Sequence, residues 1–199
     1  MGEGNGGPVL NRYLVDKDNL PNEFPTHRHD PKFWEFLGRT VATFGFLEEV
    51  LGKAIFAFTA TRPYNETEIQ AVFTEWLKKL ERALSDPLGK LIGAFEDAVR
   101  EHPSSTLENL NDLIADLRKA AELRNVLCHG SWRLPDKNGA SIPFFVTPKM
   151  RVFDSAIDLE FLVQTQKHIA ELACEVVNCV THMGLQFPGT AGPGQSFRI

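Results

Sequence analysis

The sequence predicts a mainly α fold, a bundle of five helices with a β-hairpin between the fourth and fifth helices. Three observations lead to this prediction. Apolar side chains recur at intervals of three and four residues along five segments, which is the period of an amphipathic helix. Prolines, glycines and short polar side chains separate these segments. Before the last segment, two short apolar runs flank a polar turn, which is typical of a hairpin.

The first helix is expected over residues 32–60. Asp30 is suited to the N-cap, and Pro31 to the first helical position. Glu48 lies within the apolar face of this helix, whose other members are Phe33, Leu37, Val41, Phe44, Leu51, Ile55 and Phe58. A neighbouring stripe holds small residues, which indicates a closely packed second backbone or a dimer face: Gly38, Ala42, Gly45 and Gly52.

The next three helices follow at short intervals. Residues 66–84 form the second expected helix and residues 87–102 the third. The fourth begins after Ser104 or Ser105 and ends near Gly130, a suitable C-cap glycine.

The hairpin is expected within residues 131–153, with a turn at residues 136–139. Pro143 places the second strand at an edge of the sheet, because proline has no backbone N–H for the ladder. A cap at Asp154 or Ser155 then starts the fifth helix, which runs to about residue 183.

The 199 residues suit one domain with two tails. Residues 1–31 are expected to be an irregular N-terminal arm, residues 32–185 the helical domain, and residues 186–199 a flexible, Gly- and Pro-rich C-terminal tail.

Composition excludes several classes of protein. The formal net charge of −5 argues against broad, non-specific binding of nucleic acid, although a local basic site remains compatible with it. Three cysteines without paired spacing argue against a disulfide framework or structural zinc. The chain shows no signal peptide and no membrane-spanning run, so we expect a cytoplasmic protein without membrane association.

Arg124 is an anomaly in the fourth helix, because it occupies the apolar register seven residues after Leu117. A buried guanidinium is unfavourable unless it is paired. Glu48 is the matching anomaly in the first helix. We therefore expect an ion pair between Arg124 and Glu48.

Two further polar residues follow Arg124 before the helix ends. Asn125 and His129 are four residues apart and so share a helix face, and the long Arg124 side chain can reach the same point. A fixed cation, an imidazole that titrates near neutral pH and an amide together suit phosphate chemistry. Arg124, Asn125 and His129 are therefore the candidate catalytic residues.

These residues resemble the signature of the HEPN family of helical domains, in which an arginine, often followed by a polar residue, precedes a histidine by four to six positions. The run Arg124-Asn125-Val126-Leu127-Cys128-His129 fits this pattern, and the resemblance extends to the layout of residues 32–184. It implies a metal-independent endoribonuclease that acts as a homodimer. His129 would be the general base or acid, Arg124 would hold the phosphate, and Asn125 would orient the reacting group.

The same resemblance implies a biological setting. Many HEPN proteins are toxins or act in phage defence, often beside an antitoxin protein. Other members have lost catalysis. The alternative is therefore a non-catalytic HEPN-like interaction or ligand-binding protein, in which Arg124 is a structural ion pair and His129 only complements the helix dipole.

Other candidate sites have weaker support. The run His27-Arg28-His29-Asp30 lies in an expected loop without a second set of ligands, so we predict no metal site. Cys128 is expected to pack as a small apolar side chain and not to act as a nucleophile. No glycine-rich phosphate-binding motif occurs, and no cofactor is expected.

Overall fold

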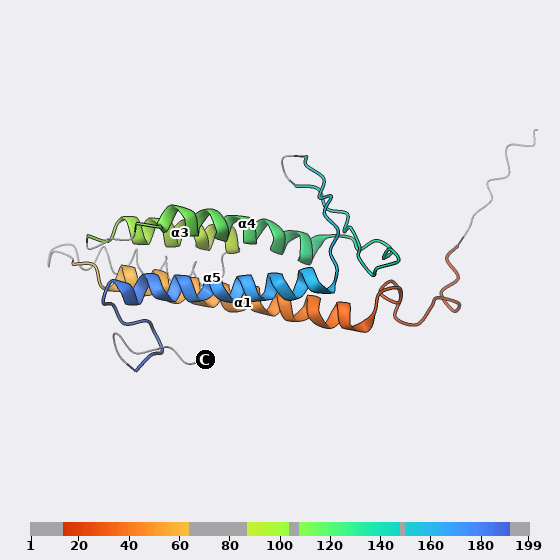
Figure 1. Ribbon diagram of the computed structural model, residues 1–199, viewed down its shortest axis with the longest axis horizontal. Helices are drawn as coiled ribbons and strands as arrows, with labels where there is room; N and C mark the ends of the chain where they lie inside the picture. Colours follow the sequence, from red (N-terminus) through yellow and green to blue (C-terminus); the bar gives the residue numbers. More distant parts are fainter. Residues whose placement is uncertain (1–13, 64–86, 104–107, 148–149, 192–199) are drawn as a thin grey trace, which may run out of the picture.

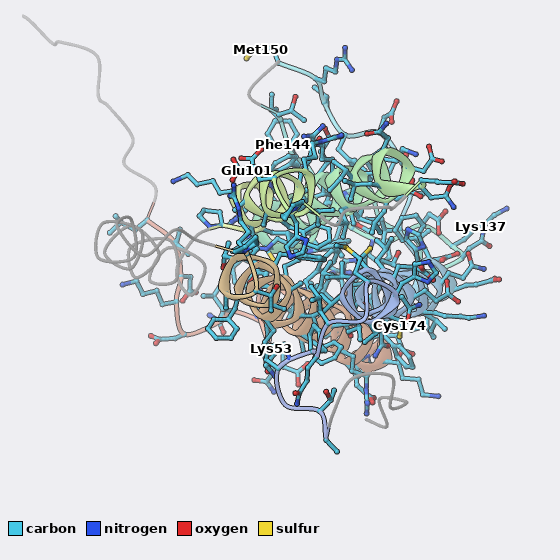
Figure 2. All side chains as sticks on the ribbon, turned by 90° about the vertical axis from the view of Figure 1, so that its left-hand side faces the viewer. Lys53, Glu101, Lys137, Phe144, Met150 and Cys174 are labelled. Carbon is cyan, nitrogen blue, oxygen red and sulfur yellow. The ribbon has the colours of Figure 1, made fainter. Side chains whose placement is uncertain are left out.

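The computed structural model describes residues 14–63, 87–103, 108–147 and 150–191, and these form four helices. They are α1 (Pro31–Ala60), α3 (Leu88–Arg100), α4 (Leu110–His129) and α5 (Leu159–His182). The helices lie side by side, with α3 and α4 on one side and α1 and α5 on the other (Figures 1 and 2). The predicted mainly α class is confirmed. The second expected helix, residues 66–84, lies outside the described residues.

Helix α1 is the central element, because it packs against α3, α4 and α5, most extensively against α5. It begins as predicted: Pro31 is its first residue, and the Asp30 carboxylate accepts a hydrogen bond of 2.8 Å from the backbone N–H of Lys32. Of the seven apolar residues predicted for its inner face, six are buried, and Val41 is half-buried against the core. Burial of this continuous apolar face is what holds the other helices around α1.

Among the described residues, no second backbone lies against two of the glycines in the small-residue stripe of α1. Gly38 and Gly45 are exposed, and a Cβ atom placed on either would meet no heavy atom within 4 Å. The expectation of a closely packed second backbone is therefore wrong at these two positions within the described chain.

Residues 131–153, here called the arm, leave the end of α4 and project from the bundle (Figure 1). The predicted turn is present, because Gly139 N–H donates to the Asp136 carbonyl at 3.0 Å. Within the described residues the arm has no continuous strand. Single antiparallel bridges take the place of the expected hairpin ladder: Ser131 with Phe144, Val146 with Val152, and Ser141 with Ile157 just beyond the arm. Pro143 lies between two of the bridged residues, Ser141 and Phe144, and cannot extend the pairing because it has no backbone N–H.

Helix α5 begins later than the predicted caps at Asp154 and Ser155. The bridge to Ser141 keeps Ile157 extended, and Ile157 is completely buried. Asp158 is the N-cap instead, and its carboxylate accepts a hydrogen bond of 2.8 Å from Phe161 N–H. A tertiary contact therefore overrides the local capping signal.

Two residues of the expected tails are buried against the helical domain. Phe187, in the predicted C-terminal tail, is 1% exposed and belongs to the core. His29, in the irregular segment expected over residues 1–31, is also buried. No described helix combines the length and apolar character needed to cross a membrane.

Candidate functional site

The predicted catalytic residues lie in the last two turns of α4. Val126 and Leu127 are buried and fix the orientation of these turns against the core. Asn125, Cys128 and His129 are exposed on the opposite side. Asn125 and His129 therefore share one solvent-facing surface at the end of a rigidly packed helix.

Arg124 lies at the border between the buried and exposed sides of α4. Its Nη2 atom is 3.7 Å from Oε1 of Glu48 on α1, and each of the two side chains is 29% exposed. This places the expected pair within ion-pair range, although the distance exceeds that of a hydrogen bond. Among the described residues the Arg124 guanidinium donates no hydrogen bond, so its N–H groups can bind an anion.

Helix α4 ends at Gly130, a position with little space for a side chain. Gly130 has an extended backbone, with φ −69° and ψ 139°, and not the left-handed conformation that often follows a helix. A Cβ atom at this position would lie 2.5 Å from the Val126 carbonyl oxygen and 2.8 Å from Cβ of Pro143. The predicted C-cap position is therefore correct, and glycine fits there because both the last turn of α4 and the arm lie so close.

An aromatic cluster holds the chain three residues beyond His129. Trp132 packs edge-on against Phe33 and Trp34, with ring centroids 5.0 and 6.2 Å apart. The indole N–H of Trp34 donates to the Thr26 carbonyl at 3.0 Å. His29 stacks on Phe33 at 4.6 Å, and burial lowers the pKa of its imidazole. The cluster anchors the exit from α4 and so limits the positions that His129 can adopt.

The cluster does not form a metal site. Within the described part of the chain, no group of three or more His, Cys, Asp or Glu side chains could hold a metal ion.

The three thiols differ in exposure. Cys128 is exposed, so the expectation that it packs as a small apolar side chain is wrong. Cys174 is also exposed, whereas Cys179 is buried, and burial together with the nearby Glu175 raises the pKa of Cys179 to about 11. Cys179 is therefore a poor nucleophile at neutral pH.

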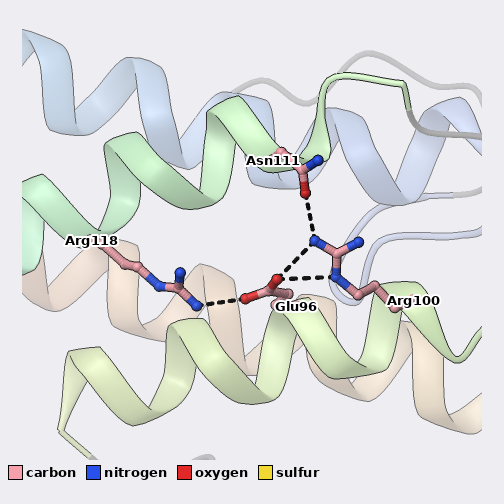
Figure 3. Close-up of polar contacts among 4 residues, drawn as sticks. All are labelled: Glu96, Arg100, Asn111 and Arg118. Atoms are coloured by element: carbon pink, nitrogen blue, oxygen red, sulfur yellow. Dashed lines mark hydrogen bonds and ion pairs between the residues drawn. The ribbon is translucent and has the colours of Figure 1, made fainter.

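A second charged cluster, which the sequence did not predict, joins α3 to α4 (Figure 3). Glu96 is its centre and is only 18% exposed. Its carboxylate accepts hydrogen bonds of 2.8 and 3.0 Å from Arg100 and of 2.7 Å from Arg118. Arg100 also donates to the Asn111 side-chain oxygen at 2.5 Å. The Glu96–Arg100 spacing of four residues is a recognisable helix pair, but nothing local signals the partners on α4.

Comparison with protein-family models, curated proteins and solved structures finds no match to this chain.

Proposed function

We propose that this protein is a HEPN-type, metal-independent endoribonuclease, a toxin- or defence-like module that acts on RNA as a cytoplasmic homodimer. The observation that carries the proposal is the shared exposure of Asn125 and His129 beside a partly exposed Arg124. Complete burial of these side chains would have favoured a structural role instead. An antitoxin protein is the natural partner of such a module.

Each side chain suits one part of RNA cleavage. His129 accepts the proton of the 2′-hydroxyl, whose oxygen bonds to the adjacent phosphorus while the bond to the 5′-oxygen breaks. The leaving oxygen receives a proton from the partner's His129, which leaves a 2′,3′-cyclic phosphate and a 5′-hydroxyl. Arg124 stabilises the charge that develops on the phosphate, and Asn125 orients it.

The Arg124–Glu48 pair supports this assignment of roles. Glu48 draws the guanidinium toward α1 without a hydrogen bond, so the arginine is positioned while its donors stay free. Since an arginine remains charged at any physiological pH, only His129 needs to change protonation during the reaction.

Cleavage of a fluorescent single-stranded RNA tests the proposal. We expect His129→Ala to lower the cleavage rate by about 100-fold or more, the usual contribution of a general acid or base. His182→Ala is the matched control, because His182 is also exposed at the last position of a helix. Circular dichroism establishes that both variants fold. Equal rates for the wild type and His129→Ala would overturn the proposal.

The alternative is a non-catalytic interaction or ligand-binding protein. It is favoured by the fact that the Arg124–Glu48 pair joins α4 to α1, as a purely structural pair would. The alternative predicts that wild-type protein leaves RNA intact and that Arg124→Ala changes only stability.

A further inference from the structure

Among the residues that the structure describes, large apolar side chains are exposed mainly in two segments. Ten of the twelve such side chains among the described residues lie either in residues 14–25, here called the N-terminal segment, or in the arm. They are Leu14, Val15, Leu20 and Phe24 in the former, and Leu134, Ile142, Phe144, Val146, Met150 and Val152 in the latter. A concentration of this kind indicates a surface that a partner covers, whereas single exposed apolar residues do not.

The arm carries its apolar side chains as a row. Ile142, Phe144 and Val146 alternate with residues that turn inward, of which Pro143 is buried. Val146 is bridged to Val152, so the row continues onto the second half of the arm. Met150 is 82% exposed and lies farther from the helices than Phe144 (Figure 2).

The two segments carry opposite charge. The arm has four Lys or Arg residues and one Asp, a net charge of +3 in a chain whose total is −5. The N-terminal segment has one Lys and three acidic residues, a net charge of −2. One of the basic groups lies within the apolar row itself, since the Arg133 guanidinium is 5.0 Å from the centre of the Phe144 ring. An acidic, apolar segment is therefore the complement of the arm in both charge and hydrophobicity.

The N-terminal segment of the same chain does not cover the arm. Leu14 is 93% exposed and Phe144 is 50% exposed, although both segments lie at the end of the bundle where α1 begins and α4 ends (Figure 1). A second copy of the chain has the same N-terminal segment, which can cover the arm of the first copy. Because both segments lie at one end, a two-fold rotation can place each arm against the other copy's N-terminal segment.

We propose that the arm of one copy binds the N-terminal segment of a second copy, and that the two copies do so reciprocally in a dimer. The proposed ribonuclease requires a homodimer, and this contact specifies how the two copies are held. The contact depends on exposed apolar side chains and on charge, and not on RNA chemistry. A dimer that cleaves no RNA would retain the contact and overturn only the proposed activity.

Light scattering coupled to size-exclusion chromatography of the full chain tests the contact. The wild type is expected at twice the 22.3 kDa mass of one chain. Phe144→Asp is expected to raise the dissociation constant of the dimer by about tenfold or more. It removes an aromatic side chain that the contact buries, and it introduces an unpaired charge there. Val163→Asp is the matched control, because Val163 is similarly exposed on α5.

Charge reversal tests the choice of partner segment. Arg133→Glu with Arg151→Glu, and separately Asp16→Lys with Asp18→Lys, are each expected to weaken the dimer, and more so at low ionic strength. The four changes together restore the attraction and are expected to recover much of the dimer. Circular dichroism of each variant separates loss of contact from loss of fold.

Three results would overturn the inference. They are a wild-type monomer at every concentration, a Phe144→Asp dimer as tight as the wild type, and a fourfold variant no tighter than either pair of reversals. Arm variants that lose affinity for a single-stranded RNA oligonucleotide while their mass stays dimeric would instead assign the arm to nucleic acid.

Discussion

The two halves of α4 hold their arginines in different ways. In the first half, Arg118 donates to Glu96 at 2.7 Å as part of a hydrogen-bonded network. In the second half, Arg124 lies 3.7 Å from Glu48, within the range of an ion pair but beyond that of a hydrogen bond. Both carboxylates are partly buried, so burial alone does not explain the difference. An arginine committed to neighbours stabilises the fold, whereas one that is positioned but unsaturated can bind an anion.

The largest expected effect concerns activity. If Arg124 holds the phosphate, Arg124→Ala lowers the rate of RNA cleavage by about 100-fold or more, as does the loss of a charge-stabilising donor in other enzymes. Arg118→Ala is the matched control on the same helix and changes the rate by less than about twofold, since Arg118 belongs to the α3–α4 network. Single-turnover kinetics measure both. A comparable loss in the two variants would remove the distinction between the halves of α4.

The next effect concerns the backbone at the end of α4. Gly130→Ala forces a Cβ atom against the Val126 carbonyl oxygen and Pro143, and we expect the free energy of unfolding to decrease by about 1–3 kcal/mol. Gly45→Ala introduces the same methyl group into open space on α1 and is expected to increase it by about 0.5–1 kcal/mol. Urea denaturation measures both. Equal changes would contradict the close contacts that the last turn of α4 and the arm make at Gly130.

Neutral variants compare the Glu96 and Glu48 carboxylates directly. Glu96→Gln weakens three hydrogen bonds from arginines, and we expect it to lower the free energy of unfolding by about 1–2 kcal/mol. Glu48→Gln removes one long ion pair and is expected to lower it by less than about 0.5 kcal/mol. The same denaturation experiment ranks them, and the reverse order would contradict the assignment of the network as the structural half.

The smallest effect is the pH dependence of stability. Burial lowers the pKa of His29 below its usual value of 6.5. The unfolded chain then binds the proton more readily than the folded chain, so stability is lost as the pH falls through about 6.5. Burial, and then the charge of Arg62, lower the pKa of His102 and act in the same direction.

His29→Phe is expected to reduce this loss of stability between about pH 7 and pH 5, because it removes one of the two groups. Thermal unfolding at a series of pH values measures the change, with His168→Gln as an exposed control. An unchanged slope in His29→Phe would show that His29 is not buried in its neutral form.

Local signals in the sequence predicted the parts of the fold that depend on neighbouring residues. Helix α1 begins at its predicted cap, and α4 ends at the predicted glycine, because capping and helical periodicity act over a few positions. The approach of Arg124 to Glu48 was predictable because both charges interrupt an apolar register.

Contacts between distant residues were not predictable in the same way. The bridge between Ser141 and Ile157 delays α5, and the partners of Glu96 on α4 lie on another helix. The packing of Trp132 on Phe33 joins residues about a hundred positions apart. No periodic or capping signal encodes such pairings, since they depend on how the helices are placed in three dimensions.

The proposed RNA cleavage by the side chains at the end of α4 is tested most directly by mass spectrometry of the RNA ends. An RNA oligonucleotide is incubated with the protein in the presence of a metal chelator. We expect 2′,3′-cyclic phosphate ends with the wild type and intact RNA with His129→Ala. Intact RNA with the wild type, or the same cyclic ends with His129→Ala, would contradict it.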